Sequence, residues 1–351
     1  MVHYMPATGI LRMKTNHITQ QDIATRLNVS RITVSKALRN HPDISAEMKE
    51  KVNRAVEEMG YSPNLIAKQL SLQKTFILGI VVPDLENCFF SYLVDSIIDT
   101  AKEHNYNVIL TVSREKEVFE RNNIKNLIDL RVDGLLVCVS QETTDHKIFE
   151  YVSRVNIPLV FFDRAIKELP FSYVAFNDKI ATIETLNQLI SAGYTRIAHF
   201  AGYSGTSIGN ERCNGYREAL IDNRIPVRED WIIEGGYEID DGIRAFEKLY
   251  TGGELPEIIL TVNDRVASGA YKAIRKTGLK IPDDIGILGY GLNDTARLFS
   301  PTLSVIDQDP RKMGKIATDL LIDEIQGIAQ NSNTGILIDV DFKWNTSIQK
   351  R

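Results

Sequence analysis

The chain has 351 residues, 43% of them hydrophobic and 25% charged, which suffices for a sizeable core and favours two or three domains. Its cysteines, Cys88, Cys138 and Cys213, are far apart and form no CxxC, so they indicate neither a disulfide framework nor a zinc site, and free or buried thiols are expected. No apolar run approaches the roughly 20 residues of a membrane span, and the start lacks the apolar stretch of a signal peptide, so a cytoplasmic protein is expected.

Charge is divided unevenly along the chain. Residues 1–74 contain 11 Lys and Arg against 6 Asp and Glu, a net charge of +5, whereas residues 75–351 contain 30 against 40, a net charge of −10. A basic first part on an acidic body suggests that only the first part meets a polyanion. Residues 1–16 are expected to be a disordered extension, and the start is left open between Met1 and Met13.

Residues 17–60 are predicted to begin with a helix-turn-helix. Thr19 can cap a first helix that has Asp22 in its first turn. Asn28 begins a tight turn, and Ser30 can cap a second helix. Two short helices joined by about three residues have helix-turn-helix spacing.

A third helix is predicted from Ser45 to Met59, where apolar residues recur at helical spacing until Gly60 ends it. Three such helices can enclose a small core. Its predicted members are Ile23, Val34, Leu38, Val52 and Val56.

The second helix presents polar and apolar side chains away from that core. Arg31 can form paired hydrogen bonds with guanine, Lys36 can donate to guanine or phosphate, and Ile32 can contact a thymine methyl group. Neighbouring hydroxyl groups suit phosphate oxygens. The alternative is a solvated helix face in a small packing domain. The DNA contacts predicted in this part are Thr19, Ser30, Arg31, Ile32, Thr33, Ser35 and Lys36.

Residues 61–74 are predicted to form a hinge helix and linker. Pro63 breaks the chain, Asn64 can cap, and residues 65–71 could form a helix too short to be stable without a partner surface, either a second copy or DNA. Leu70 has no obvious core nearby and could wedge into a minor groove. The alternative is an ordinary linker with a buried leucine.

A family resemblance is carried by the ordered motifs TQQDIATRLNVSRITVSKALRN, SAEMKEKV and GYSPNLIAKQL. They resemble the DNA-binding head and hinge helix of the lactose-repressor (LacI/GalR) family of bacterial transcriptional regulators. The resemblance implies base-reading roles for Arg31, Ile32 and Lys36. Because isoleucine cannot form hydrogen bonds through its side chain, the operator preference of a relative cannot be transferred. The DNA contacts implied around the hinge are Tyr61, Asn64, Ala67 and Leu70.

Residues 75–351 are predicted to form an α/β body of doubly wound parallel sheets. Amphipathic helical segments alternate with short apolar runs that suit strands buried on both faces. Roughly ten strands are many for one sheet, so two similar subdomains are expected. The pattern also fits the periplasmic-binding-protein-like core of the same family, which implies an effector-binding and dimerisation domain with subdomains of about 75–175 plus 305–335 and 176–304 plus 336–351. The apolar runs are FILGIVVPD, YNVILTVS, DGLLVCVS, IPLVFFDRA, RIAHFAGY, EIILTVND and DIGILGYG.

Polar and aromatic residues follow several of these runs, where open α/β sheets bind ligands. Carboxylates, an amide and a guanidinium can pair with sugar hydroxyls, and in the family these positions line the effector cleft. Asp264 has a helix cap as its alternative role, and Phe89 and Phe90 have core packing, whereas a buried Arg212 requires an anionic or hydroxyl partner. The predicted effector contacts are Phe89, Phe90, Asp163, Arg164, Arg212, Tyr237, Asn263, Asp264 and Asn293.

One position departs from the family pattern. Many members carry an acidic residue directly after the GY or GF of the strand that corresponds to GILGYG, where this chain has Gly291. Either a usual acceptor for a sugar hydroxyl is missing, or Asn293 or Asp294 takes its place.

The leading hypothesis is a homodimeric transcriptional regulator, a repressor in preference to an activator. Its heads would read a near-palindromic operator, and a small effector, sugar-like in preference to a nucleobase, would control DNA affinity through the hinge. No cofactor, metal or membrane partner is expected, and the absence of a C-terminal leucine heptad favours a dimer over a tetramer. The alternatives are a solute-binding protein, disfavoured by the basic head, and an α/β enzyme, for which the sequence has no GxxxxGK, GxSxG or HExxH motif.

Overall fold

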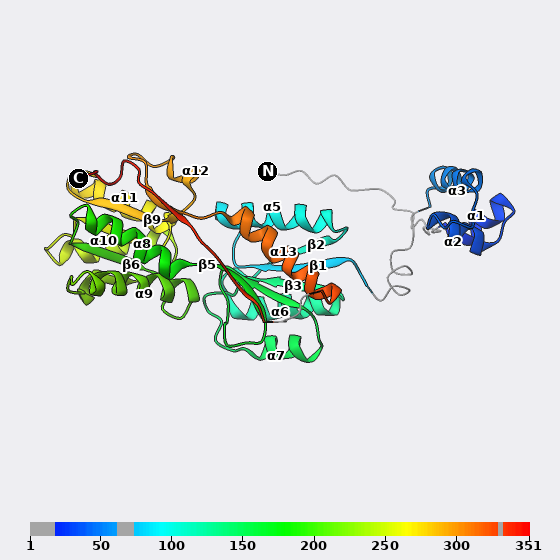
Figure 1. Cartoon of the computed structure of the whole chain (residues 1–351), viewed down its shortest axis with the longest axis horizontal. Coiled ribbons are helices and arrows are strands. Elements are labelled where there is room, and N and C mark those ends of the chain that lie inside the picture. The colour runs from blue at the N-terminus through cyan, green and yellow to red at the C-terminus, as the bar shows by residue number, and fades with distance from the viewer. Residues whose placement is uncertain (1–17, 62–73, 329–332) are drawn as a thin grey trace, which may run out of the picture. The chain divides into compact units, whose positions relative to one another are not determined.

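A computed structural model gives the fold of the chain (Figure 1). It describes residues 18–61, 74–328 and 333–351. The chain divides into two compact units, residues 1–74 and 75–351, which are called the head and the body below.

Two groups of predictions fall outside the described residues. One is the extension at the start of the chain, and the other is most of the hinge. The residues concerned are 1–16, Pro63, Asn64, Ala67 and Leu70.

The head contains the three predicted helices, α1 (Gln20–Leu27), α2 (Arg31–Leu38) and α3 (Ala46–Met59). The hydroxyl of Thr19 accepts from the N–H of Asp22, whose carboxylate accepts the N–H of Thr19, so α1 begins with a capping box. Ser30 and Ser45 also cap their helices, α2 and α3, so the predicted starts of the three helices are confirmed.

The head closes over a small apolar core. Ile23, Val34 and Val52 are fully buried, as predicted. Leu38 and Val56, also predicted as core residues, are only partly buried and pack at its edge. The remaining buried members are Ala24, Ala37, Ala55 and Tyr61.

The body contains two six-stranded sheets, one in each subdomain. Every strand pair is parallel except β10 with β12. The first sheet has the order β11-β5-β4-β3-β1-β2, with β1 (Ile77–Val82), β2 (Asn107–Val112), β3 (Gly134–Val137), β4 (Leu159–Phe162), β5 (Ser172–Phe176) and β11 (Gly335–Ile338). The second has the order β12-β10-β9-β8-β6-β7, with β6 (Ile197–Ala201), β7 (Ile232–Glu234), β8 (Ile258–Thr261), β9 (Gly286–Gly291), β10 (Ser304–Asp307) and β12 (Asp341–Lys343).

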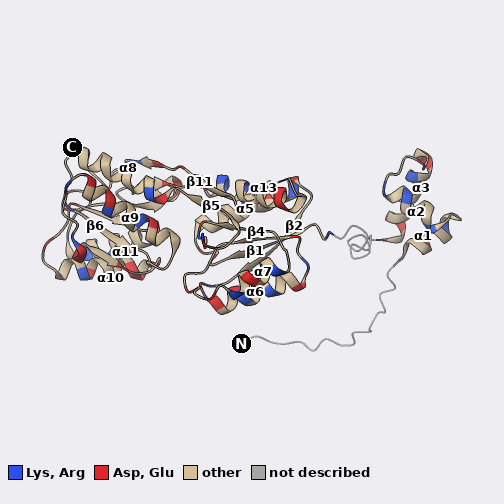
Figure 2. Cartoon of the chain, turned by 60° about the horizontal axis from the view of Figure 1, so that its bottom comes forward, with Lys and Arg blue, Asp and Glu red and all other residues tan. Residues whose placement is uncertain are grey.

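Helices cover both faces of each sheet, as the alternating pattern predicts (Figure 1). Charged residues of both signs occur along helices such as α6 and α10, whereas the strands contain few of them (Figure 2). On the first sheet, α5 (Cys88–Glu103) and α13 (Pro310–Gln326) lie opposite α6 (Glu117–Asp129) and α7 (Lys147–Arg154). On the second, α8 (Asp178–Ser191) and α9 (Ser207–Asp222) lie opposite α10 (Ile239–Thr251) and α11 (Asp264–Thr277), with short helices η1 (Glu229–Trp231) and α12 (Asn293–Ala296) beside them. Among the helices of the described ranges, none has the length and apolar character needed to cross a bilayer.

The chain crosses between the subdomains three times, after β5, after β10 and after β11. Two of the predicted boundaries are a few residues too early. Strand β10 belongs wholly to the second sheet, where Asp307 pairs with Gly291, and β11 belongs to the first sheet, where Ile338 pairs with Phe176. Each strand completes its hydrogen-bond ladder before the chain leaves the sheet, and hydrophobic patterning alone does not reveal which ladder a short strand joins.

Candidate DNA-binding and ligand-binding sites

The start of α2 presents two unpaired side chains to solvent. Ile32 is 69% exposed, and Arg31, also exposed, makes no ion pair with any described residue. A hydrophobic side chain this exposed contributes nothing to the core of so small a unit. Lys36, the third predicted base-reading residue, forms an ion pair with Asp43 at 2.8 Å, which would have to open for a DNA contact.

The hydroxyl groups predicted to contact phosphates have structural partners within the head. Thr19 and Ser30 cap α1 and α2, and Thr33 lies 2.9 Å from the hydroxyl of Ser30. The hydroxyl of Ser35 accepts a hydrogen bond from Arg39 at 3.2 Å. Tyr61 packs in the head core. These contacts fix the shape of the head, and contact with DNA by the same residues remains a prediction.

Basic residues of the head concentrate on its first two helices. Residues 19–40 contain four Lys and Arg against one Asp, whereas residues 45–59 of α3 contain three against four Glu. The polyanion-binding surface is therefore expected on α1 and α2, the two helices of the predicted helix-turn-helix.

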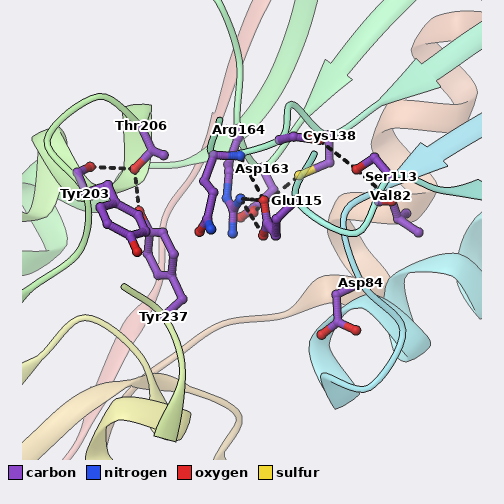
Figure 3. A network of polar contacts seen from close by, with 12 residues as sticks. Val82, Asp84, Ser113, Glu115, Cys138, Asp163, Arg164, Tyr203, Thr206 and Tyr237 are labelled. Carbon is purple, nitrogen blue, oxygen red and sulfur yellow. Dashed lines mark hydrogen bonds and ion pairs between the residues drawn. The ribbon is translucent and has the colours of Figure 1, made fainter. Parts of the chain in front are cut away.

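In the body, a polar network spans the region between the two sheets (Figure 3). Arg164 follows β4, and its Nη1 donates to both carboxylate oxygens of Glu115 at 2.8 and 2.9 Å. Its guanidinium also lies over the ring of Tyr237 from the second subdomain, 4.8 Å from the centroid. Arg164 thus contacts both subdomains.

Asp163, Arg114 and Glu115 are among the residues of the chain that have a left-handed backbone. Asp163 has φ 60°, and the adjacent Arg114 and Glu115 have φ 53° and 58°, a left-handed conformation that side chains with a Cβ rarely adopt. Asp163 is buried, and the Cys138 thiol donates to it at a sulfur–oxygen distance of 3.8 Å. Burial raises the pKa of Asp163, although the nearby arginines oppose that shift. Local strain of this kind is typical of functional sites.

Arg212, on α9, has the anionic partner that its burial requires, and that partner belongs to the protein. Its Nη2 donates to the carboxylate of Asp178 at 3.1 and 3.3 Å, and its Nη1 donates to the carbonyl of Val262. The guanidinium lies 3.7 Å from the ring centroid of Tyr290. Burial raises the pKa of Asp178 to about 6 even though Arg212 favours the ionised form.

The polar residues after β8 are Asn263 and Asp264, and the helix cap expected as an alternative role of Asp264 is formed by Asn263. Asn263, and not Asp264, caps α11 by accepting the N–H of Val266 at 2.8 Å. Asn263 also donates to the carbonyl of Tyr237 at 3.0 Å. Asp264 is the first residue of the helix, and its carboxylate accepts from Thr295 at 3.1 Å.

Asp264 also lies beside Gly291, the position at which the chain departs from the family pattern. A Cβ built on Gly291 would have three atoms of Asp264 as its nearest neighbours, with Oδ2 at 3.2 Å. The sequence instead predicts that Asn293 or Asp294 replaces the acidic residue that relatives have at the position of Gly291. Asn293 begins α12, where Asn345 donates to it at 3.5 Å. The carboxylate beside Gly291 is therefore that of Asp264.

Phe89 and Phe90 begin α5, as predicted, and belong to the core of the first subdomain. Their rings meet edge to face at 5.3 Å, and Phe89 also contacts Phe176 at 6.1 Å. Packing accounts for both residues, so an effector contact by either is a prediction that rests on the family resemblance.

Several residues of the network were not predicted from the sequence. Cys138 follows a strand and could have been found by the rule that selected Asp163. Asp178 follows β5, which was not among the predicted strands. Glu115 reaches the site through a strained loop, for which the sequence has no signal.

Further contacts join the subdomains: Arg265 with Asp84 at 3.3 Å, Lys167 with Glu211 at 2.7 Å, and the N–H of Ala165 with the hydroxyl of Ser207 at 3.3 Å.

A helix-turn-helix head and a body of two α/β subdomains with a polar network between them define the class of ligand-responsive DNA-binding regulators. The comparisons with known proteins agree with that class. The chain belongs to the LacI family: residues 19–64 match "Bacterial regulatory proteins, lacI family", and residues 75–346 match "Periplasmic binding proteins and sugar binding domain of LacI family". It is a transcriptional regulator and not an enzyme, since its relatives are repressors.

Two relatives and one solved structure illustrate the similarity. The ribose operon repressor of Haemophilus influenzae is 30% identical over 319 residues, 91% of this chain and 95% of the relative. The transcriptional repressor PurR of Vibrio campbellii is 31% identical over 309 residues, 88% of this chain and 92% of the relative. The structure of the lac repressor dimer bound to operator and the anti-inducer ONPF has a TM-score of 0.85 at 26% identity, covering 95% of this chain and 99% of that one.

Proposed function

We propose that the protein is a cytoplasmic repressor that binds a near-palindromic operator as a homodimer and responds to a small, hydroxyl-rich effector bound between the body subdomains. What supports the proposal is that one chain contains two separate surfaces whose chemistry suits binding. One is the start of α2, with Arg31 and the 69% exposed Ile32. The other is the strained polar network around Arg164 and Asp163.

For DNA, the proposed contacts follow from the chemistry of the exposed residues. The Arg31 guanidinium suits the O6 and N7 acceptors of guanine, and Ile32 suits a thymine methyl group. Thr19, Ser30, Thr33, Ser35 and Lys36 are proposed as further contacts to phosphates or bases. Two heads related by a twofold axis would read two half-sites of opposite direction.

For the effector, the proposed ligands are the polar groups that meet between the sheets. Asp163 offers a buried carboxylate, Asn263 an amide, and Arg164 and Arg212 guanidinium groups. These groups suit the alternating donors and acceptors of a sugar, against which an aromatic ring such as that of Tyr237 can pack. An effector that contacts both subdomains favours one relative arrangement of them, and differential affinity for the two arrangements couples effector to DNA.

The experiment that tests this function has two steps. Selection from random double-stranded oligonucleotides by the full-length protein yields a bound sequence, and fluorescence anisotropy on that duplex yields affinity. We expect an inverted repeat. Arg31→Ala should weaken binding by about 1–3 kcal/mol and relax the preference at one base pair of each half-site.

Arg54→Ala is the matched control, because Arg54 lies on α3 and pairs with Glu50 at the surface. It should leave the preferred sequence unchanged. Failure to select any sequence at low salt by a folded protein, or loss of base preference in the control but not in Arg31→Ala, would contradict the proposal.

A further inference from the structure

A cavity of about 310 Å³ lies beside the polar network, between the two subdomains. The first subdomain contributes the end of β4 with Arg164 and Lys167, and the loop after β3 with Thr143 and His146. The second contributes the loop from Ser204 to Ser207 that leads into α9. Its volume lies at the lower end of the range typical of small-molecule sites. Of the predicted effector contacts Arg164 lines it, whereas the others do not: Phe89, Phe90, Asp163, Arg212, Tyr237, Asn263, Asp264 and Asn293.

Arg164, which lines the cavity, has hydrogen-bond donors that no described residue occupies. The residue is 5% exposed, and its Nε is buried without a hydrogen-bond partner among the described residues. Glu115 occupies only Nη1, so the edge formed by Nε and Nη2 has no acceptor in the described part of the chain. That edge has the spacing that holds two oxygens of a carboxylate or a phosphate. A buried donor without a partner destabilises a protein, and a ligand oxygen would satisfy it.

The opposite wall is the N-terminal end of α9. Thr206 caps the helix by accepting the N–H of Gly209, so the N–H groups of Ser207 and Ile208 have no partner within the helix. The aligned peptide dipoles place partial positive charge at this end of a 16-residue helix. Arg164 from the first subdomain and Thr206 and Ser207 at the start of α9 from the second therefore line the same cavity.

Most carboxylates around the cavity have partners within the protein. Glu115 is paired with Arg164, and Glu211 is paired with Lys167. Glu168 is exposed and has no ion pair among the described residues, whereas Glu120 and Glu234 accept hydrogen bonds from Thr143 and Ser204 of the lining. Among the buried lining groups, the free edge of Arg164 therefore remains without a partner in the described part of the chain. His146 also lines the cavity.

We propose that this cavity binds an anionic group of the effector, a phosphate or a carboxylate, so that the effector is an acidic sugar rather than a neutral one. The inference rests on the proposed function and specifies its ligand class. The sugar hydroxyls would occupy the network around Asp163, and the anion would lie between Arg164 and the start of α9. An anion held there would bridge the subdomains, since its two walls come from different sheets.

The test uses isothermal titration calorimetry on the full-length protein. Inorganic phosphate and acetate report on the anion site without stereochemical demands, and glucose 6-phosphate and glucuronate are compared with glucose to distinguish a sugar phosphate from a sugar acid. We expect phosphate or acetate to bind, and the matching sugar derivative to bind at least about tenfold more tightly than glucose, because a charge-assisted pair contributes about that factor.

Two substitutions of Gly205 allow the effect of a negative charge on anion binding to be measured separately from the effect of side-chain size. Gly205 lines the cavity, and a Cβ added there meets no atom within 4 Å, so the Cβ of Gly205→Asp or Gly205→Asn causes no clash. The aspartate also lies near the start of α9, where a carboxylate favours the helix. We expect Gly205→Asp to weaken anion binding about tenfold or more through like-charge repulsion, and Gly205→Asn to weaken it less than about threefold.

Three outcomes distinguish failure of the proposed anion site from failure of the proposed regulatory function. If neither phosphate nor acetate binds, or if both variants bind them equally, the anion site is wrong. If a neutral sugar alone binds and changes operator affinity, the anion site is also wrong, but the regulatory function stands. If anions bind as expected while no duplex is bound, the cavity assignment survives and the proposed function fails.

Discussion

The ion pair between Arg212 and Asp178 permits a sharp prediction about stability. Both side chains are 3% exposed, and the pair joins α9 to α8 inside the second subdomain. Asp178→Asn keeps the size of the side chain and removes its charge. Arg212 cannot lose its proton, so the variant buries an uncompensated cation, at a cost of about 3–5 kcal/mol. This is a large part of the 5–15 kcal/mol by which proteins of ordinary stability resist unfolding.

The assay is urea unfolding followed by tryptophan fluorescence. Trp231 and Trp344, the only two tryptophans of the sequence, both belong to the second subdomain. With an m-value of about 3 kcal/mol/M, the expected loss lowers the midpoint by about 1 M urea or more. Glu218→Gln is the matched control, because Glu218 pairs with Lys179 across the same two helices at the surface. An exposed pair contributes at most about 1 kcal/mol.

The reverse substitution behaves differently with pH. In Arg212→Met the carboxyl of Asp178 can take up a proton, and its pKa in the folded state rises above the value of about 6 that it has beside the arginine. The folded state then binds more protons than the unfolded one. The free energy of unfolding should rise by about 1.4 kcal/mol per unit as the pH falls from 7 towards 4. If Asp178→Asn costs no more than Glu218→Gln, or if Arg212→Met shows no such slope, this reasoning is refuted.

Two further predictions concern single buried positions. Burial raises the pKa of Glu120, which accepts from the N–H of Ser140, to about 6, so the folded state binds its proton more tightly and stability falls as the pH rises from about 4.5 to 6. Glu120→Gln should remove about 2 kcal/mol of that pH dependence in urea titrations, and parallel curves for the variant and the wild type would contradict it. A Cβ added to Gly242 would meet the carbonyl of Val266 at 2.0 Å, so Gly242→Ala should separate α10 from α11 and destabilise by at least about 1–3 kcal/mol. Gly205→Ala, where the Cβ meets open space, should leave the melting temperature within about a degree or two, and similar losses in both variants would rule out the steric explanation.

The helices of the head and most buried strands of the body could be predicted because local chemistry specifies them. A serine or threonine at an N-cap stabilises the helix that follows it wherever that helix packs, as Thr19, Ser30 and Ser45 do. Continuous apolar runs such as that of β4 are stable only when both faces are covered. Short strands carry a weaker signal. Strand β11 follows polar residues and is half exposed, so only its pairing with β5 identifies it.

The candidate ligand site was predictable only in part. The rule about carboxyl ends of strands found Asp163, Arg164 and Asn263, because parallel strands present those ends at one edge. It could not reveal that Arg164 is paired with Glu115, which a strained loop supplies from another part of the sheet. Nor could it reveal which residue would cap α11.

The sequence by itself determined the fold class of the head and of the body. Capping residues and hydrophobic periodicity act between residues that are close in the sequence, so both can be recognised without the structure. Only the tertiary structure decided which charges neutralise one another. Asp178 with Arg212 and Glu115 with Arg164 are separated by 34 and 49 positions, yet each pair lies within hydrogen-bond distance. The physical reason is that the strength of an electrostatic contact depends on distance and burial after folding, and neither quantity is written in the spacing of residues along the chain.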